Sequence, residues 1–484
     1  MPVDPVLSLS AAEAVAAVRA GAVTARALVR AALERARACA DLNAFVVVDE
    51  AGALAAADRI DAARAAGEVL PALAGLPVVV KDNINLDGLP TTGGTPALRD
   101  ARPSNTAPSA RRLVEAGAIV LGKTNLHELA FGITSTNLAP FAGPVRNPYD
   151  RTRIPGGSSG GTAAAIAARV ATCGLGSDTG GSTRVPAALC GIAGLRPSVG
   201  DGGPQRRYHD DGAVVPISRT RDTVGPMGRT VADVALLDAV ITGTPVAEPV
   251  PLAGLRLGVP AQCWSGLEAR VARAAAAARA RLEAAGAVLV DLSIPDLFPM
   301  DERVSFVVAL HEPREDIPAY LAASGLAETV TLESIAAAVA SPDVRGAFDA
   351  ILADAFGAQY PEAMRVHRPA LQALYARTFA DHRLDALLFP TTMLAAVEID
   401  EVRGSGTTTI DGGIEVDTFG SFIRNTGPAS NAGLPGLSMP AGLVDGGLPW
   451  GLEIDGPLGS DRRLLGIGLS IEAALGPVPA PPGA

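Results

Sequence analysis

Residues 155–161 read Pro-Gly-Gly-Ser-Ser-Gly-Gly, and residues 176–184 read Gly-Ser-Asp-Thr-Gly-Gly-Ser-Thr-Arg. A single Gly/Ser cluster is usually a flexible loop. These two, however, lie inside the most apolar part of the chain, between Ala-rich and apolar segments, where flexible linkers are not normally found. Glycine permits backbone conformations closed to other residues and lets a ligand approach the backbone closely. The two clusters together therefore predict a functional site.

Helical and strand patterns alternate on both sides of the clusters. We expect short apolar strands at 77–80, 118–121, 288–290 and 387–389, and helices at 109–116, 160–169 and 267–285. Near the N-terminus, Ser10 begins a capping box, and Thr24 caps a second helix that runs towards Ala40. Continuous apolar strands separated by helices are typical of a parallel or mixed sheet covered on both faces. The sequence therefore predicts an α/β fold.

No linker, charge block or internal repeat divides the 484 residues, so we expect one domain over residues 1–484. Within it we expect N-terminal helices in 1–70 and a catalytic core in 71–240. The region from about 297 to 380 has few strand signals, and we expect it to be mostly helical and to cap the sheet.

Composition narrows the classes of partner and compartment. The chain has 40 Lys and Arg residues against 51 Asp and Glu, a net charge of −11. Nucleic acids and acidic membranes bind clustered positive charge, so neither is expected as the main partner. No signal peptide and no apolar run of about 18 residues is found, so we expect a cytoplasmic protein without a transmembrane helix. The four cysteines are far apart, which indicates neither a zinc site nor a disulfide framework.

The second cluster has the composition of a nucleophile loop. Thr179-Gly180-Gly181-Ser182 can present successive backbone N–H groups to one point, and such a nest stabilises a developing oxyanion. A serine hydroxyl needs a base. None of the five histidines lies near either cluster in sequence, whereas Lys81 follows a strand, where α/β sheets often place catalysis. Burial there would favour a neutral amine; the alternative is a charged strand end that reaches solvent.

Three motifs in this order resemble the amidase signature family: Val80-Lys81-Asp82-Asn83, the cluster at 156–161, and the cluster at 176–184 with Pro186. Ser158 and Ser182 are 24 residues apart, and Lys81 precedes Ser158 by 77 residues, as in that family. The resemblance covers nearly the whole chain, including 191–197 and 434–442. It implies a single domain with a mixed, twisted, many-stranded sheet covered by helices on both faces.

The resemblance also implies hydrolysis of an amide-type C–N bond without metal or cofactor. Ser182 would form an acyl-enzyme, and Ser158, after a cis Gly157–Ser158 peptide, would pass protons between Ser182 and Lys81. The expected oxyanion donors are the N–H groups of Thr179, Gly180, Gly181 and Ser182. Gly132 would lie beside the substrate carbonyl, and the expected supporting residues are Asp178, Arg184 and Ser159.

The segments 143–148, 216–227 and 461–465 are similar to the mandelamide and indoleacetamide hydrolase branch of the family. This similarity implies a small amide substrate with an aryl or arylalkyl group, and a monomer or homodimer. Anilides, aryl esters and carbamates (urethanes) remain open as substrates. Residues 199–212 are longer and more polar than in that branch, and we expect them to border the entrance of the site. Phe131 and Ile133 are candidates for an apolar pocket wall, or else core residues.

Other classes have less support. The A subunit of the glutamyl-tRNA amidotransferase shares the signature, but the segment 216–227 looks unlike that subunit. Residues 157–161 also match the G-x-S-x-G elbow of α/β-hydrolases, which requires a preceding strand; Pro148 and Pro155 argue against one. No G-x-G-x-x-G or Walker pattern is present, so nucleotide binding is not expected. A catalytically inactive scaffold is disfavoured because all three catalytic positions are filled.

Overall fold

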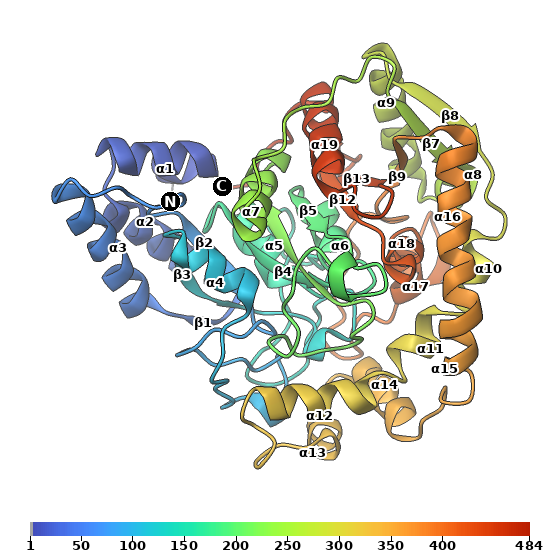
Figure 1. The fold of residues 1–484 in the computed structure, drawn as a ribbon, viewed down its shortest axis with the longest axis horizontal. Coiled ribbons are helices and arrows are strands. Elements are labelled where there is room, and N and C mark those ends of the chain that lie inside the picture. Colours follow the sequence, from blue (N-terminus) through green and yellow to red (C-terminus); the bar gives the residue numbers. More distant parts are fainter. Residues whose placement is uncertain (1–2) are drawn as a thin grey trace.

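The computed structural model describes residues 3–484 and contains one large mixed sheet with helices on both faces (Figure 1). Its eleven strands follow the order β1-β3-β2-β4-β6-β5-β12-β13-β9-β7-β8. In chain order, the strands are β1 Phe45–Val48, β2 Pro77–Lys81, β3 Ile119–Thr124, β4 Cys173–Asp178, β5 Ala193–Arg196, β6 Thr223–Gly228, β7 Arg256–Pro260, β8 Val288–Leu292, β9 Ala386–Pro390, β12 Gly436–Leu443 and β13 Pro449–Asp455. The expected α/β class is confirmed.

The sheet contains two parallel groups separated by antiparallel strands. β2 pairs in parallel with β3 and β4, and β7 pairs in parallel with β8 and β9. The strands between them pair antiparallel, for example β4 with β6 and β12 with β13. The mixed character expected of the sheet is therefore present.

All four expected strands form, but the glycine-rich strands were not predicted. β4 contains residues 176–178, which the sequence assigned to a Gly/Ser cluster. Its glycines reflect tight packing: a Cβ at Gly174 would lie 2.4 Å from the carbonyl oxygen of Val79, and one at Gly176 would lie 2.7 Å from Oγ of Ser159. Glycine is normally unfavourable in strands, so its presence here indicates close approach of neighbouring atoms.

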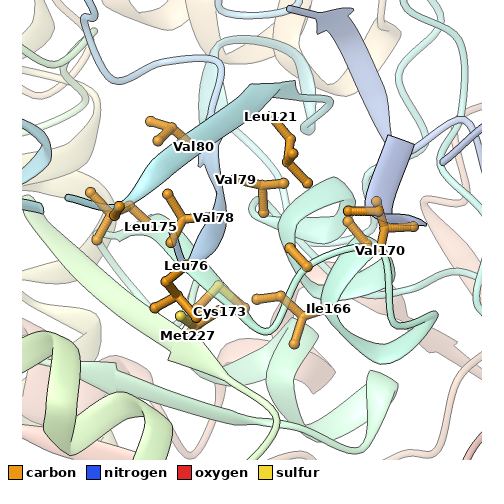
Figure 2. Close-up of a cluster of buried hydrophobic side chains, with 14 of the residues drawn as sticks. Leu76, Val78, Val79, Val80, Leu121, Ile166, Val170, Cys173, Leu175 and Met227 are labelled. Atoms are coloured by element: carbon orange, nitrogen blue, oxygen red, sulfur yellow. The ribbon is translucent and has the colours of Figure 1, made fainter. Parts of the chain in front are cut away.

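The first helices of the chain lie at one end of the sheet, and those that follow pack along its middle (Figure 1). The Ser10 capping box and the Thr24 N-cap are both formed. The helices are α1 Ala11–Ala20, α2 Ala25–Ala38, α3 Glu50–Ala65, α4 Pro108–Glu115, α5 Gly160–Ala167, α6 Arg184–Cys190 and α7 Val231–Thr242. Figure 2 shows the apolar core around β2, where Val78, Val79 and Val80 lie among Ile166, Val170, Leu175 and their labelled neighbours.

Helix α5 consists of small buried residues and packs directly against backbone. A Cβ at Gly161 would lie 2.4 Å from the carbonyl oxygen of Asn125 and 2.5 Å from that of Ala44. A larger residue at this position would push the helix away from the sheet. Because α5 begins two residues after Ser158, this packing also fixes the position of the first Gly/Ser cluster.

Residues from 297 to 382 form helices without a strand in this described range, as expected. They are α10 Leu297–Glu302, α11 Ser305–Ala309, α12 Pro313–Ala323, α13 Leu332–Ala338, α14 Pro342–Leu352, α15 Tyr360–Glu362, the π-helical turn η6 Ala363–His367 and α16 Arg368–His382. A separate apolar cluster, which includes Tyr320 and Phe348, joins α12, α13 and α14 to the loops around Leu98, Leu129 and Val215.

The remaining elements complete the other end of the molecule. They are α8 Ala261–Trp264, α9 Ala269–Ala284, the hairpin β10 Thr407–Ile410 with β11 Ile414–Asp417, and the helices α17 Thr418–Ile423, α18 Gly427–Ala432 and α19 Asp461–Leu475. None of the helices among residues 3–484 has both the length and the apolar character that crossing a membrane requires.

Candidate active site

Lys81 is the last residue of β2, and its side chain is fully buried. Its Nζ donates hydrogen bonds to Oγ of Ser158 at 2.7 Å and to Oγ of Ser177 at 2.9 Å. Burial lowers the pKa of Lys81 to about 7, although the carboxylates of Asp178 and Asp222 act in the opposite direction. The amine is therefore partly neutral near pH 7, and the alternative of a solvated strand-end charge is wrong.

Ser158 is fully buried and follows a cis Gly157–Ser158 peptide bond. Its carbonyl oxygen accepts hydrogen bonds from the backbone N–H of His127 at 3.2 Å and from Oγ of Ser135 at 3.4 Å. A Cβ at Gly157 would lie 2.9 Å from the backbone of Ser135, so the turn leaves no room for a side chain. The hydroxyl of Ser158 is thus held in place towards Lys81.

Ser182 lies between β4 and α6, and it lines a cavity although only 6% of its surface is exposed. Its carbonyl oxygen accepts a 3.1 Å hydrogen bond from the N–H of Ser159. The hydroxyl of Ser159 donates to the carbonyl oxygen of Ser177 at 3.2 Å. These bonds join the two Gly/Ser clusters, so Ser158 and Ser182 belong to one rigid unit.

Asp178 organises the loop that carries Ser182. Its carboxylate accepts hydrogen bonds from the N–H groups of Gly181 at 3.0 Å and Thr183 at 3.1 Å. It also forms buried ion pairs with Arg184 at 3.0 Å and Arg196 at 3.1 Å. Burial alone would raise the pKa of Asp178, but the two guanidinium groups hold it well below its usual range. The expected pairing of Asp178 with Arg184 is therefore present.

The bond from Gly181 corrects the expectation of four free oxyanion donors. Because the Gly181 N–H donates to Asp178, its role is to shape the loop. The N–H groups of Thr179, Gly180 and Ser182 donate to no acceptor in residues 3–484. Thr179, Gly180 and Ser182 also line the cavity. Three donors thus remain for an oxyanion, where sequence reasoning expected four.

The cavity beside Ser182 has a volume of about 250 Å³ and mostly apolar walls. Phe131 and Ile133 both line it, as expected for a pocket wall. Other parts of the wall come from segments far away in the sequence, and their apolar residues include Ile217, Phe306, Leu310 and Phe419. Polar side chains in the lining include Arg221, Asp343 and Asp417.

Sequence reasoning missed His127, which connects several parts of the site. Its Nε2 lies 2.9 Å from Oδ2 of Asp343 on α14, and its Nδ1 accepts a hydrogen bond from the N–H of Ser135 at 3.2 Å. Its ring lies against Gly132, where an added Cβ would be 2.2 Å from Nε2. Gly132 also lines the cavity. No sequence signal pointed to His127, because its partners are close only in the folded chain.

Residues 199–212 do not line the cavity at Ser182, so the expectation that they border its entrance is wrong. Their side chains at 206, 208, 210 and 211 line a separate cavity of about 530 Å³ beside α12. Asp222 also lines this second cavity, and it accepts a hydrogen bond from the hydroxyl of Thr179 at 2.5 Å. The stretch therefore lies at a different cavity from the one beside Ser182.

Comparison with known proteins agrees with this geometry. The profile of the Amidase family matches residues 27–465. The chain is 43% identical over 490 residues to mandelamide hydrolase of Pseudomonas putida, with 98% of this chain and 92% of that protein covered. It is 43% identical to indoleacetamide hydrolase of Agrobacterium vitis, with 93% of each protein covered.

Solved structures show the same fold. A crystal structure of an amidase superposes with a TM-score of 0.82 at 33% identity, covering 97% of this chain and 100% of the other. The peptide amidase of Stenotrophomonas maltophilia gives a TM-score of 0.79 at 29% identity, with 99% of each chain covered. The chain therefore belongs to the amidase family, and it is an enzyme that acts on amides.

Proposed function

We propose that this enzyme hydrolyses aryl or arylalkyl amides with Ser182 as nucleophile, Ser158 as proton shuttle and Lys81 as base. One observation carries the proposal: the buried amine of Lys81 donates a 2.7 Å hydrogen bond to Ser158, next to the loop that carries Ser182. At its ordinary pKa a lysine is protonated near neutral pH and cannot accept a proton, but burial lowers the pKa of Lys81 to about 7.

In the acylation step, Oγ of Ser182 attacks the amide carbonyl while its proton passes to Ser158. Ser158 in turn gives its own proton to the neutral amine of Lys81. The carbonyl oxygen becomes an oxyanion that accepts hydrogen bonds from the free N–H groups of the nucleophile loop. Lys81, now charged, returns the proton through Ser158 to the departing nitrogen as the C–N bond breaks.

The same groups serve the second half of the reaction. A water molecule attacks the acyl-enzyme, and its proton follows the route through Ser158 to Lys81. Collapse of the second tetrahedral intermediate returns the proton to Ser182 and releases the carboxylic acid. Each group ends in its starting protonation state, so the cycle balances with water as the only co-reactant.

The walls of the cavity support an aromatic substrate group. Phe131, Phe306 and Phe419 come from three different segments and enclose the space beside Ser182. Aromatic rings make favourable contacts with one another and bury a large apolar area. The relatives named above are hydrolases of mandelamide and indoleacetamide. Anilides, aryl esters and carbamates would be attacked by the same chemistry, and carbamate cleavage is the second candidate activity.

The proposal is tested by assaying the purified single chain on phenylacetamide, its anilide, its methyl ester and the matched benzyl carbamate. We expect hydrolysis of the primary amide, and Ser182→Ala should remove it. Ser293→Ala is the matched control, because Ser293 is exposed on the loop after β8. Absence of amide hydrolysis by the parent chain, or full activity of Ser182→Ala, would contradict the proposal. Hydrolysis that requires a second protein would instead indicate the amidotransferase class.

A further inference from the structure

Arg221 is the feature of the cavity that the proposed mechanism does not use. It lies in the loop before β6, only 3% of its surface is exposed, and it lines the cavity beside Ser182. Its Nε donates to Oγ of Ser218 at 3.3 Å, and its Nη1 donates to the carbonyl oxygen of Ser305 at 3.2 Å and to Oδ1 of Asn431. Two of the three guanidinium nitrogens are therefore held by the protein.

The third nitrogen of the guanidinium, Nη2, is free. Within residues 3–484, Nη2 of Arg221 donates to no acceptor, and no carboxylate lies within 4.0 Å of the side chain. Arginine stays charged under all ordinary conditions, and a buried charge without a partner is costly. Buried arginines are usually paired with a carboxylate, so the missing partner of Arg221 needs an explanation.

The nearby acidic side chains are engaged elsewhere. The carboxylate of Asp222 accepts hydrogen bonds from Thr179, Ile217 and Ser218. That of Glu312 accepts from Ser218, Thr220 and Tyr360, and that of Asp301 accepts from Asn431. Burial lowers the pKa of Arg221, and these carboxylates act in the opposite direction without bonding to Nη2.

We propose that Arg221 binds an acceptor oxygen on the part of the substrate that occupies the cavity. The proposal rests on the proposed function, since it assigns the substrate group held next to Ser182. The substrate would combine an aromatic body, which fits the apolar walls, with a hydroxyl, ether, carbonyl or carboxylate oxygen. Because Nε and Nη1 are held, the N–H groups of Nη2 point in a fixed direction, which suits such an oxygen well.

The expected effect is on selectivity. A hydrogen bond from a charged group contributes about 1.5–3 kcal/mol, which corresponds to roughly 10- to 150-fold in kcat/KM. A substrate without the oxygen leaves the buried N–H groups unpaired and loses this contribution. Arg221 is therefore a specificity-determining residue for the reaction that Ser182 carries out.

The test uses primary amides, because only the acyl group can then occupy the cavity. Phenylacetamide is compared with analogues that carry a hydroxyl, methoxy or carboxylate group at the α, meta or para position. We expect at least one oxygen-bearing analogue to be preferred by the parent enzyme by tenfold or more in kcat/KM. In Arg221→Met, the ratio of its kcat/KM to that of phenylacetamide should fall by about 10- to 100-fold, and Arg221→Lys should keep part of it.

Arg219→Met is the matched control. Arg219 lies two residues away, pairs with Asp316 and Glu315, and is not part of the cavity lining. The Arg219→Met variant should keep the parental ratio between the kcat/KM of the oxygen-bearing analogue and that of phenylacetamide. A second measurement needs no variant: the acid products with the preferred oxygen should inhibit the parent enzyme at least tenfold more strongly than phenylacetic acid.

The outcomes separate the two proposals. If the parent hydrolyses phenylacetamide but prefers no oxygen-bearing analogue, the role of Arg221 is refuted while the proposed function stands. Equal losses on all substrates in Arg221→Met would show a structural role and also refute it. If the parent hydrolyses no amide, the proposed function fails first. Preference for carboxylate over methoxy analogues would identify an anionic acyl group, and the reverse would identify a neutral one.

Discussion

Nζ of Lys81 lies 2.7 Å from Oγ of Ser158, and no carboxylate in residues 3–484 lies within 4.0 Å of it. A second fully buried lysine differs in this respect: Nζ of Lys123 is 3.2 Å from Oδ1 of Asp82. Burial lowers the pKa of Lys123, and the carboxylate of Asp82 acts in the opposite direction. Lys81 has only hydroxyl partners, and such surroundings allow an amine to take up and release a proton.

The pH profile should follow the titration of Lys81. Burial lowers its pKa to about 7, and only the neutral amine can act as a base. We therefore expect kcat/KM for an amide to be constant above about pH 8 and to fall about tenfold per pH unit below pH 7. Measurement between pH 5 and 9 under kcat/KM conditions checks this. An activity that does not change over this range would show that another group is the base.

Lys81→Ala should slow amide cleavage more than ester cleavage. Proton return through Ser158 helps a poor amine leaving group, whereas an alcohol needs less help. In the parent enzyme, acylation by a matched amide and ester should differ by about one or two powers of ten, or roughly 1.4–2.7 kcal/mol in barrier. Single-turnover acylation of both substrates, in the parent and in the variant, provides the measurement. Equal losses in the acylation rate of the amide and the ester would show that Lys81 acts only in the attack step and does not return a proton to the leaving nitrogen.

Asp178→Ala should destabilise the fold strongly. The substitution leaves Arg184 and Arg196 without their shared carboxylate in a fully buried place, although Arg184 keeps its 2.6 Å contact with Glu453. Breaking a buried pair by removal of one partner typically costs about 3–5 kcal/mol. Urea unfolding measures the change in the free energy of unfolding. As the control, Asp445→Ala removes an exposed pair with Arg273 and should have little effect; similar losses in both variants would argue against this account.

Gly132→Ala should impair catalysis because of the ring of His127. The new methyl group would lie 2.2–2.4 Å from three atoms of that ring, which would have to move away from Asp343. We expect kcat/KM to fall at least tenfold, about 1.4 kcal/mol in barrier. Gly346→Ala serves as a control on α14, since no atom lies within 4 Å of its added Cβ. It should keep full activity and gain about 0.5–1 kcal/mol in stability. A fully active Gly132→Ala would refute the steric argument.

Much of the fold could be predicted from the sequence because the strongest patterns in the sequence are local. Apolar strands such as 77–80 and 387–389 form within one or two residues of their predicted bounds. Strand β4 was missed since its glycines carry no apolar pattern; they are there because the neighbouring backbone comes close. How closely neighbouring strands and helices pack is a property of the folded chain, so it cannot be predicted from a short segment of sequence.

The candidate site, like the fold, could be predicted only in part. The resemblance of the motifs to the amidase signature implied that Ser158 lies next to Lys81, and the contact of 2.7 Å agrees. The donation from Gly181 to Asp178 depends on the course of one turn, which composition does not specify. His127 meets Asp343 across 216 residues of sequence, and Arg221 meets Asn431 across 210. Such contacts arise only when distant segments pack together.

Part of the cavity wall is encoded far along the chain from the candidate catalytic residues. Lys81, Ser158 and Ser182 are attached to β2, β4 and the adjoining turns, whereas Phe306, Leu310 and Phe419 belong to helices and loops outside the sheet. Mutations in the outer segments can therefore reshape the acyl pocket without moving the groups that transfer protons. An enzyme built in this way can acquire new substrates in small evolutionary steps, because each intermediate variant keeps its reaction chemistry.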